Sequence, residues 1–150
     1  MAIFVIHEHH AKQLHFDLRL EIDNVLKSWA VPKGPSMNPG EKRLAIMVED
    51  HAREYASFEG VIPQGMYGAG NVVIWDKGRF DIQGGSVQQG KLDIFFRGEK
   101  LKGGFALIRI SGKENDWLLM KKRDEYADHS FTLKTMLPAL KKSGKKRKSS

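Results

Sequence analysis

The chain contains no cysteine, so it can form neither a disulfide framework nor a thiolate zinc site. It also has no apolar run that approaches the length needed to cross a bilayer. Its first residues, MAIFVI, lack the basic start and the long apolar middle of a signal peptide. These absences predict a protein of a reducing, cytoplasmic compartment with no membrane partner.

Positive charge is concentrated at one end of the chain. The formal net charge is +7, but six of the 25 basic residues fall between Lys141 and Lys148, where no acidic residue occurs. Without those six, 19 basic residues face 18 acidic ones, so the remaining chain is close to neutral. We expect one domain at residues 1–140, followed by a disordered basic tail at 141–150. The tail is suited to attracting a polyanion such as DNA, or it is a solubilising terminus without a partner.

Short β-rich runs separated by turn signals dominate the sequence. The expected strands are residues 3–6, 14–22, 25–31, 44–48, 71–75, 79–82, 91–96, 105–110 and 117–121. This spacing, with no long helical period between the runs, predicts an all-β fold: a small closed or partly closed antiparallel β-barrel. Residues 23–24 and 76–78 are predicted hairpin turns. Only the segment from Phe131 to Leu140 has helical spacing, which predicts a short C-terminal helix.

The most informative stretch is His9-x5-His15-x-Asp17, followed two residues later by Arg19. In a strand, alternate residues share a face, so His15, Asp17 and Arg19 point one way and the apolar residues between them point the other. Two imidazoles, a carboxylate and a guanidinium that grips phosphate oxygens predict a divalent metal and a phosphate held side by side. The alternative is an ordinary strand surface on which Asp17 pairs with Arg19 in water.

A second polar strand is expected at residues 43–51. Its odd positions carry Arg43, Glu49 and His51, opposite an apolar stripe at positions 44, 46 and 48. An arginine and a histidine are suited to neutralising charge on phosphoryl oxygens and to transferring a proton, while Glu49 is suited to orienting one of these cations. The alternative is a surface ion pair between Arg43 and Glu49 with a solvated His51.

Eight segments of the chain carry a resemblance to a known family. They are HHAKQLHFDLRLE (9–21), LKSWAVPKGP (26–35), KRLA (42–45), VEDH (48–51), YASFEGVIP (55–63), YGAG (67–70), WD (75–76) and WLLMK (117–121). Together they resemble the 3′-phosphoesterase domain of bacterial DNA ligase D. The resemblance covers nearly everything before the basic tail.

The resemblance implies a small β-barrel enzyme that heals DNA 3′ ends before non-homologous end joining. Members of this family use manganese, or another divalent transition metal. They remove a 3′-terminal ribonucleoside to leave a 3′-phosphate, and then remove that phosphate to leave a 3′-hydroxyl. The partners implied are DNA or DNA–RNA 3′ ends and a separate DNA ligase, and we expect a stand-alone monomer.

Motif position implies a role for individual residues. The implied metal ligands are His9, His15 and Asp17, with His10 as the alternative to His9 because it fills a position that is often acidic in the family. The residues implied around the scissile phosphate are Arg19, Arg43 and His51 in contact with it, Glu49 and Tyr55 supporting the site, and Lys33 as a further candidate.

Two other functions remain open from the sequence. One is a non-catalytic DNA-end binding module whose metal site only clamps a phosphate. The other is a non-haem iron oxygenase, because the His15-x-Asp17 pair with His51 as a distal ligand would build a facial triad. Oxygen-dependent turnover would favour the second, and metal-dependent binding without product would favour the first.

Overall fold

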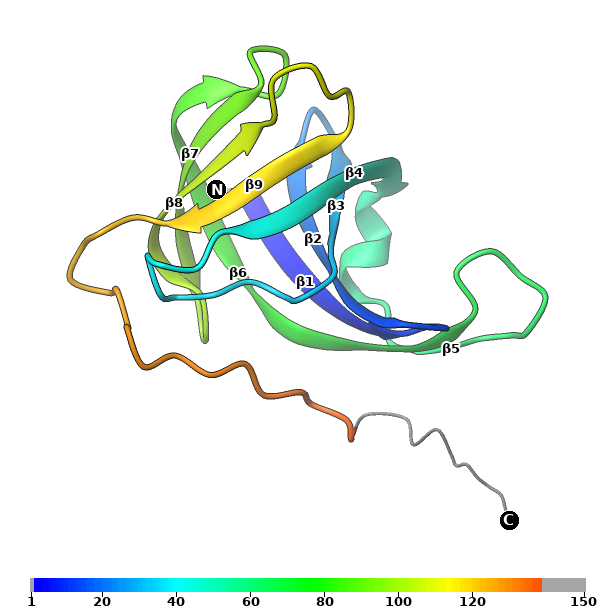
Figure 1. Cartoon of the computed structure of the whole chain (residues 1–150). Helices are drawn as coiled ribbons and strands as arrows, with labels where there is room; N and C mark the ends of the chain where they lie inside the picture. Colours follow the sequence, from blue (N-terminus) through cyan, green and yellow to red (C-terminus); the bar gives the residue numbers. More distant parts are fainter. Residues whose placement is uncertain (1, 139–150) are drawn as a thin grey trace.

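An antiparallel sheet curls into a closed barrel in the computed structural model, which describes residues 2–138 (Figure 1). Its elements are β1 (Ala2–His10), β2 (Leu14–Ile22), β3 (Val25–Val31), β4 (Arg43–Ala52), the 3₁₀ helix η1 (Arg53–Ser57), β5 (Gly60–Ile62), β6 (Gly70–Ser86), β7 (Lys91–Gly98), β8 (Lys102–Arg109) and β9 (Asp116–Lys121). The strand order is β1-β2-β3-β4-β9-β8-β7-β6-β5, and β1 also pairs with β6. This last pairing closes the ring and leaves β5 outside it, so the predicted β-barrel is confirmed in its closed form.

Apolar and polar residues alternate along the strands, and the inward-facing apolar residues form one core inside the barrel. On β2, Phe16, Leu18 and Leu20 face inward and are at most 1% exposed. All three tryptophans of the chain lie in the same core. Residues of the other parity point away from the core, so His15, Asp17 and Arg19 of β2, and the β1 residues His7 and His9 that pair with this face, lie on the outer side of the barrel.

The hairpin turns follow the sequence in one case and depart from it in another. Asp23 and Asn24 have φ angles of 55° and 67°, as a tight hairpin between β2 and β3 requires, so this turn is confirmed. The turn predicted at residues 76–78 is wrong, because β6 runs through it without interruption. Asp76 instead accepts the backbone N–H groups of residues 99–101 in the β7–β8 turn, at 2.7–3.1 Å. A Cβ at Gly78 would lie 2.2 Å from a carbonyl oxygen of β7, so this glycine permits a close strand approach.

The described residues contain little helix: η1 has five residues, and no helix among residues 2–138 is long and apolar enough to cross a membrane. The expected C-terminal helix is therefore wrong for its described part, residues 131–138, which form an irregular strap along the barrel (Figure 1). Backbone N–H groups of Met136 and Leu137 donate to the Glu8 carboxylate at 2.6 and 2.9 Å. Trp75 Nε1 donates to the Lys134 carbonyl at 2.8 Å. Because the barrel satisfies these backbone groups, the segment does not need helical partners. Residues 139–150, including the predicted basic tail, lie outside the described residues.

Glu8 is the anchor of this strap. Its side chain is fully buried, and the same carboxylate lies 2.6 Å from His10 Nε2 on the core side of β1. It therefore accepts from three donors at once, of which His10 Nε2 is buried and the two backbone N–H groups are partly buried.

We expect Glu8→Ala to lower the free energy of unfolding by about 3 kcal/mol, because it leaves buried donors without an acceptor. Urea denaturation of the full chain measures this change. Glu99→Ala, at an exposed position, is the control and should change the free energy by less than about 0.5 kcal/mol. Equal losses in the two variants would contradict the anchoring role of Glu8.

Candidate metal centre

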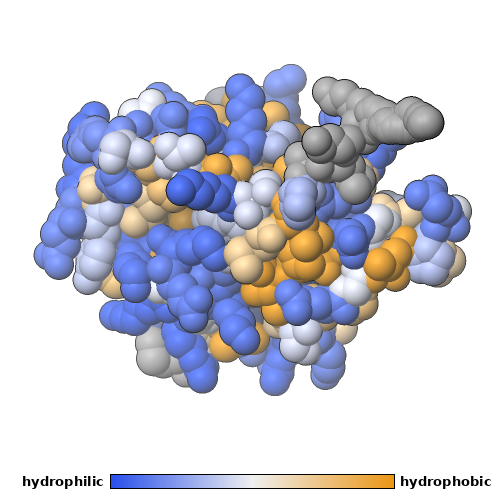
Figure 2. Space-filling view, turned by 90° about the horizontal axis from the view of Figure 1, so that it is seen from below, coloured by the Kyte–Doolittle hydropathy of each residue, from blue (hydrophilic) through white to orange (hydrophobic). Residues whose placement is uncertain are grey.

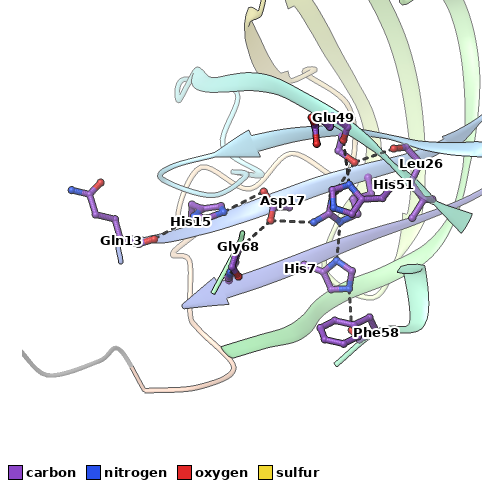
Figure 3. A network of polar contacts seen from close by, with 12 residues as sticks. His7, Gln13, His15, Asp17, Leu26, Glu49, His51, Phe58 and Gly68 are labelled. Carbon is purple, nitrogen blue, oxygen red and sulfur yellow. Dashed lines mark hydrogen bonds and ion pairs between the residues drawn. The ribbon is translucent and has the colours of Figure 1, made fainter. Parts of the chain in front are cut away.

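Side chains of β1 and β2 converge on the outer face of the barrel (Figure 3). Antiparallel pairing places His9 opposite His15 and His7 opposite Asp17. One ligand atom each from His9, His15 and Asp17 lies within 4.8 Å of the other two. The structure thus brings together the three residues that the sequence predicted as metal ligands.

Backbone carbonyls orient both imidazoles of this cluster. His9 Nε2 donates to Gly68 O at 2.8 Å, and His15 Nδ1 donates to Gln13 O at 3.2 Å. The opposite nitrogens, His9 Nδ1 and His15 Nε2, face the oxygens of Asp17 at 3.5 and 3.3 Å. On a doubly protonated ring these nitrogens donate to Asp17, whereas on a neutral ring they carry lone pairs that repel the carboxylate. A cation between them removes that repulsion, so the donor set fits a metal ion.

The surroundings keep Asp17 ionised. Burial acts to raise its pKa, but hydrogen bonds from His15 and His9 and the charge of Arg19 lower the pKa well below the usual range of an aspartate. Burial acts to lower the pKa of His15, but its bond with Asp17 raises that pKa above the ordinary value. A charged carboxylate beside two imidazoles is a donor set for a divalent transition metal.

His10 points away from this cluster. Successive residues of a strand face opposite sides, and His10 Nε2 bonds to Glu8 on the core side at 2.6 Å. Its exposed fraction is 3%. Among the described residues, His9 and not His10 therefore belongs to the donor cluster.

Arg19 lies beside the cluster, held through all three guanidinium nitrogens. Nε donates to His7 Nδ1 at 3.0 Å, Nη1 donates to Ser28 Oγ at 2.9 Å, and Nη2 lies 3.3 Å from Asp17 Oδ2. The ring of Tyr55 lies 5.0 Å from its Cζ. With only 4% of the residue exposed, the planar cation has a fixed orientation.

A cavity of about 250 Å³ opens over these side chains. Its polar lining consists of His9, His15, Asp17, Arg19, His51 and Tyr55, and the rest of its wall consists of Ala30, Val48, Ile62, Tyr67 and Gly68. The donor cluster and the guanidinium thus share one cavity, as the binding of a phosphoryl group beside a metal requires.

A β-bulge in β4 brings His51 to this cavity. The pairing of β4 with β3 shifts between Val48 and His51, where β4 carries one extra residue. Because of that residue, Val48 and His51 both face the cavity although their parity differs. Arg43 precedes the bulge and shares its parity with Ala45, which is fully buried in the core. The bulge therefore separates Arg43 from His51, which unbroken alternation would place on one face.

Three residues predicted for the site lie outside the cavity. Arg43 Nη2 lies 3.2 Å from Glu41 Oε1. Glu49 is exposed at the bulge, and its backbone carbonyl lies 3.2 Å from His51 Nδ1. Lys33 is exposed in the loop after β3. The structure thus assembles His9, His15, Asp17, Arg19, His51 and Tyr55, and does not bring Arg43, Glu49 or Lys33 to them.

His51 and Tyr55 complete the polar wall. His51 Nδ1 lies 3.1 Å from Arg19 Nη1, and burial together with the Arg19 charge lowers the pKa of His51. A guanidinium only donates, so the neutral tautomer of His51 that accepts from Arg19 at Nδ1 carries its proton on Nε2, whereas the tautomer protonated on Nδ1 donates to Glu49 O instead. Burial raises the pKa of Tyr55 although the charge of Arg19 opposes that shift, so its hydroxyl stays protonated at neutral pH. The Tyr55 ring stacks on Phe58 with centroids 4.9 Å apart.

His7 is a site residue that the sequence analysis missed. It is fully buried, its Nδ1 accepts from Arg19 Nε, and its Nε2 donates to the Phe58 carbonyl at 3.1 Å. Burial and the Arg19 charge lower the pKa of His7 to about 4, so the ring is a neutral acceptor at pH 7. The signal that could have found it is its position two residues before His9, on the same face of a strand.

We expect His7→Leu to weaken binding of inorganic phosphate about tenfold, because Arg19 Nε loses the acceptor that orients it. Calorimetric titration of the manganese-supplemented protein measures the affinity. His7→Gln keeps an acceptor for Arg19 and a donor for the Phe58 carbonyl, and should stay within about threefold of the original affinity. An unchanged affinity for phosphate in His7→Leu would contradict the role of His7 in orienting Arg19.

Asp17→Asn should lower the affinity for Mn²⁺ by about 100-fold or more, since removing a direct ligand costs at least as much as removing a supporting one. Calorimetric titration with MnCl₂ gives the dissociation constant. His51→Ala is the matched control, because this imidazole lines the same cavity outside the donor cluster and its loss should leave the affinity unchanged. A comparable loss in the control would mean that His51 is a ligand.

The chain is similar to known proteins over most of its length. Residues 7–109 match the family model of the DNA Ligase D 3′-phosphoesterase domain. The multifunctional non-homologous end joining protein LigD of Pseudomonas aeruginosa is 49% identical over 126 residues, which cover 81% of this chain and 15% of that protein. The multifunctional non-homologous end joining DNA repair protein LigD of Mycobacterium tuberculosis is 43% identical over 143 residues, covering 94% of this chain and 19% of that protein. The chain thus spans less than a fifth of the length of these relatives.

Proposed function

We propose that this chain, which belongs to the DNA ligase D 3′-phosphoesterase domain family, heals DNA 3′ ends as a metal-dependent phosphoesterase. It removes a 3′-terminal ribonucleoside to leave a 3′-phosphate, and then removes that phosphate. The resulting 3′-hydroxyl is the end that a separate ligase joins. The observation that carries the proposal is the single cavity that holds the His9, His15 and Asp17 cluster beside Arg19.

The proposed metal ligands are His9, His15 and Asp17, and the proposed ion is Mn²⁺. Their mixed nitrogen and oxygen donors also suit other divalent transition metals. When bound, such an ion supplies a Lewis acid for a phosphoryl oxygen. His51 bonds to Arg19 and lies outside the donor cluster of the described residues, which disfavours a facial triad of an iron oxygenase.

The other residues of the cavity act on the phosphoryl group. Arg19 binds its non-bridging oxygens and stabilises the charge that builds on them in the transition state. Its contacts with His7 and Ser28 hold the guanidinium in place beforehand. His51 presents its Nε2 proton to the leaving oxygen, and Tyr55 supports Arg19 through its ring. Arg43, Glu49 and Lys33 have no direct contact in this mechanism because they lie outside the cavity.

A DNA strand that ends in a single ribonucleotide, incubated with the full chain and Mn²⁺, tests the proposal. We expect a product with a 3′-phosphate that then becomes a 3′-hydroxyl, resolved by mass spectrometry, and no product when the metal is chelated. Arg19→Ala should lower kcat/KM by about 100-fold or more, because it removes the main source of charge stabilisation.

Arg97→Ala is the control for that variant, because Arg97 lies on β7 outside the cavity. It should retain the original kcat/KM. Strand binding that depends on the metal but gives no product under any condition would reject the enzyme and support a DNA-end binding module.

A further inference from the structure

The loop between β5 and β6, residues 63–69, forms one rim of the cavity. Ile62, Tyr67 and Gly68 contribute to the lining, and the Gly68 carbonyl holds His9 at 2.8 Å. Gly65 and Gly68 have φ angles of +86° and +76°, which L side chains rarely adopt. These glycines determine the path of the loop over the donor cluster.

Large side chains of this rim are exposed to solvent. Val61, Met66 and Tyr67 have exposed fractions of 69%, 61% and 82%. Figure 2 shows the largest apolar patch just right of centre and a smaller apolar group toward the right edge, the side on which the β5–β6 loop projects in Figure 1. An aromatic ring with free faces is a stacking partner for a nucleobase.

The rim also lacks charge. Residues 60–70, GVIPQGMYGAG, contain no acidic and no basic side chain. A DNA strand carries a negative charge at every phosphate and is held by cations. The terminal nucleoside beyond a scissile phosphate carries no further phosphate, so an uncharged rim suits this nucleoside and not the strand.

Tyr67 is close to the group that would bind the phosphate. Tyr67 and Arg19 both line the cavity, and the carbonyl of Gly68, the next residue after Tyr67, contacts His9 of the donor cluster at 2.8 Å. The phenol therefore reaches the cavity although most of its surface is exposed. A nucleoside attached to a phosphate at Arg19 would extend onto this ring.

We propose that the nucleoside rim, formed by Ile62 and Tyr67 where the β5–β6 loop lines the cavity, is the subsite for the 3′-terminal nucleoside that the first step releases, with Tyr67 stacked on its base. This inference rests on the proposed function, and it assigns the rim to only one of the two proposed steps. The first substrate contains the terminal nucleoside, whereas the second, a 3′-phosphate end, does not. Tyr67 therefore contributes to nucleoside removal and not to phosphate removal.

Kinetics of the two steps, measured separately on the full chain with Mn²⁺, test this division. Tyr67→Ala should lower kcat/KM about tenfold for a strand with a 3′-terminal ribonucleoside, chiefly through KM, as expected for the loss of one base stack. Hydrolysis of a 3′-phosphate end should change less than about twofold. Tyr67→Phe keeps the ring and should behave as the original protein in both steps. Equal losses in the two steps would overturn the inference.

A matched substrate separates the base from the sugar. When the terminal ribose carries hydrogen in place of the base, Tyr67→Ala and the original protein should have the same kcat/KM. A tenfold difference on this substrate would also overturn the stacking role. Thermal unfolding of each variant should be unchanged, since Tyr67 is exposed.

A binding measurement without turnover gives an independent readout. A strand that ends in 2-aminopurine riboside, with metal chelated, should lose fluorescence when saturated with the original protein or Tyr67→Phe, but not with Tyr67→Ala. Equal quenching by all three proteins, or none by the original protein at saturation, would contradict stacking on Tyr67. If the original protein processes no 3′ end with any divalent metal, the proposed function itself fails. If it does so and Tyr67→Ala matches it on every substrate, only this inference fails.

Discussion

The pairing of β1 with both β2 and β6 is the constraint on which the barrel and the site together depend. It closes the sheet, and it gives β1 polar residues on both of its faces. His7 and His9 face outward toward the cavity, whereas Glu8 and His10 face inward and hold the C-terminal strap. A shift of this strand by one residue would exchange the two sets, so the register that closes the barrel also specifies the donor cluster.

The chemistry of the cavity depends on groups that are not themselves ligands. Backbone carbonyls of Gly68 and Gln13 select the imidazole nitrogens that face Asp17. The side chains of His7 on β1 and Ser28 on β3, the strands on either side of β2, accept hydrogen bonds from Arg19 and fix its orientation. These supports come from four separate segments, which explains why the side chains of His9, His15, Asp17 and Arg19 keep a fixed geometry beside the cavity.

Two features of the fold could not be predicted from local patterns in the sequence. Strict alternation along β4 places Arg43 and His51 on one face, but a single extra residue between Val48 and His51 reverses the relation. Helical spacing from Phe131 to Leu140 predicted a helix, but in its described part, residues 131–138, the backbone bonds to Glu8 and Trp75 of the barrel. Both depend on partners distant in sequence, which local periodicity does not contain.

The sequence by itself determined the all-β class, the β2–β3 hairpin, and the shared face of His15, Asp17 and Arg19, because period-two alternation and turn chemistry act between near neighbours. Its motifs also identified the family before the fold was known. Only the tertiary structure decided between His9 and His10, added His7, and separated Arg43, Glu49 and Lys33 from the cavity. The physical reason is that these outcomes depend on strand register, on one bulge and on the loop that covers the outer wall, all of which arise when distant segments pair.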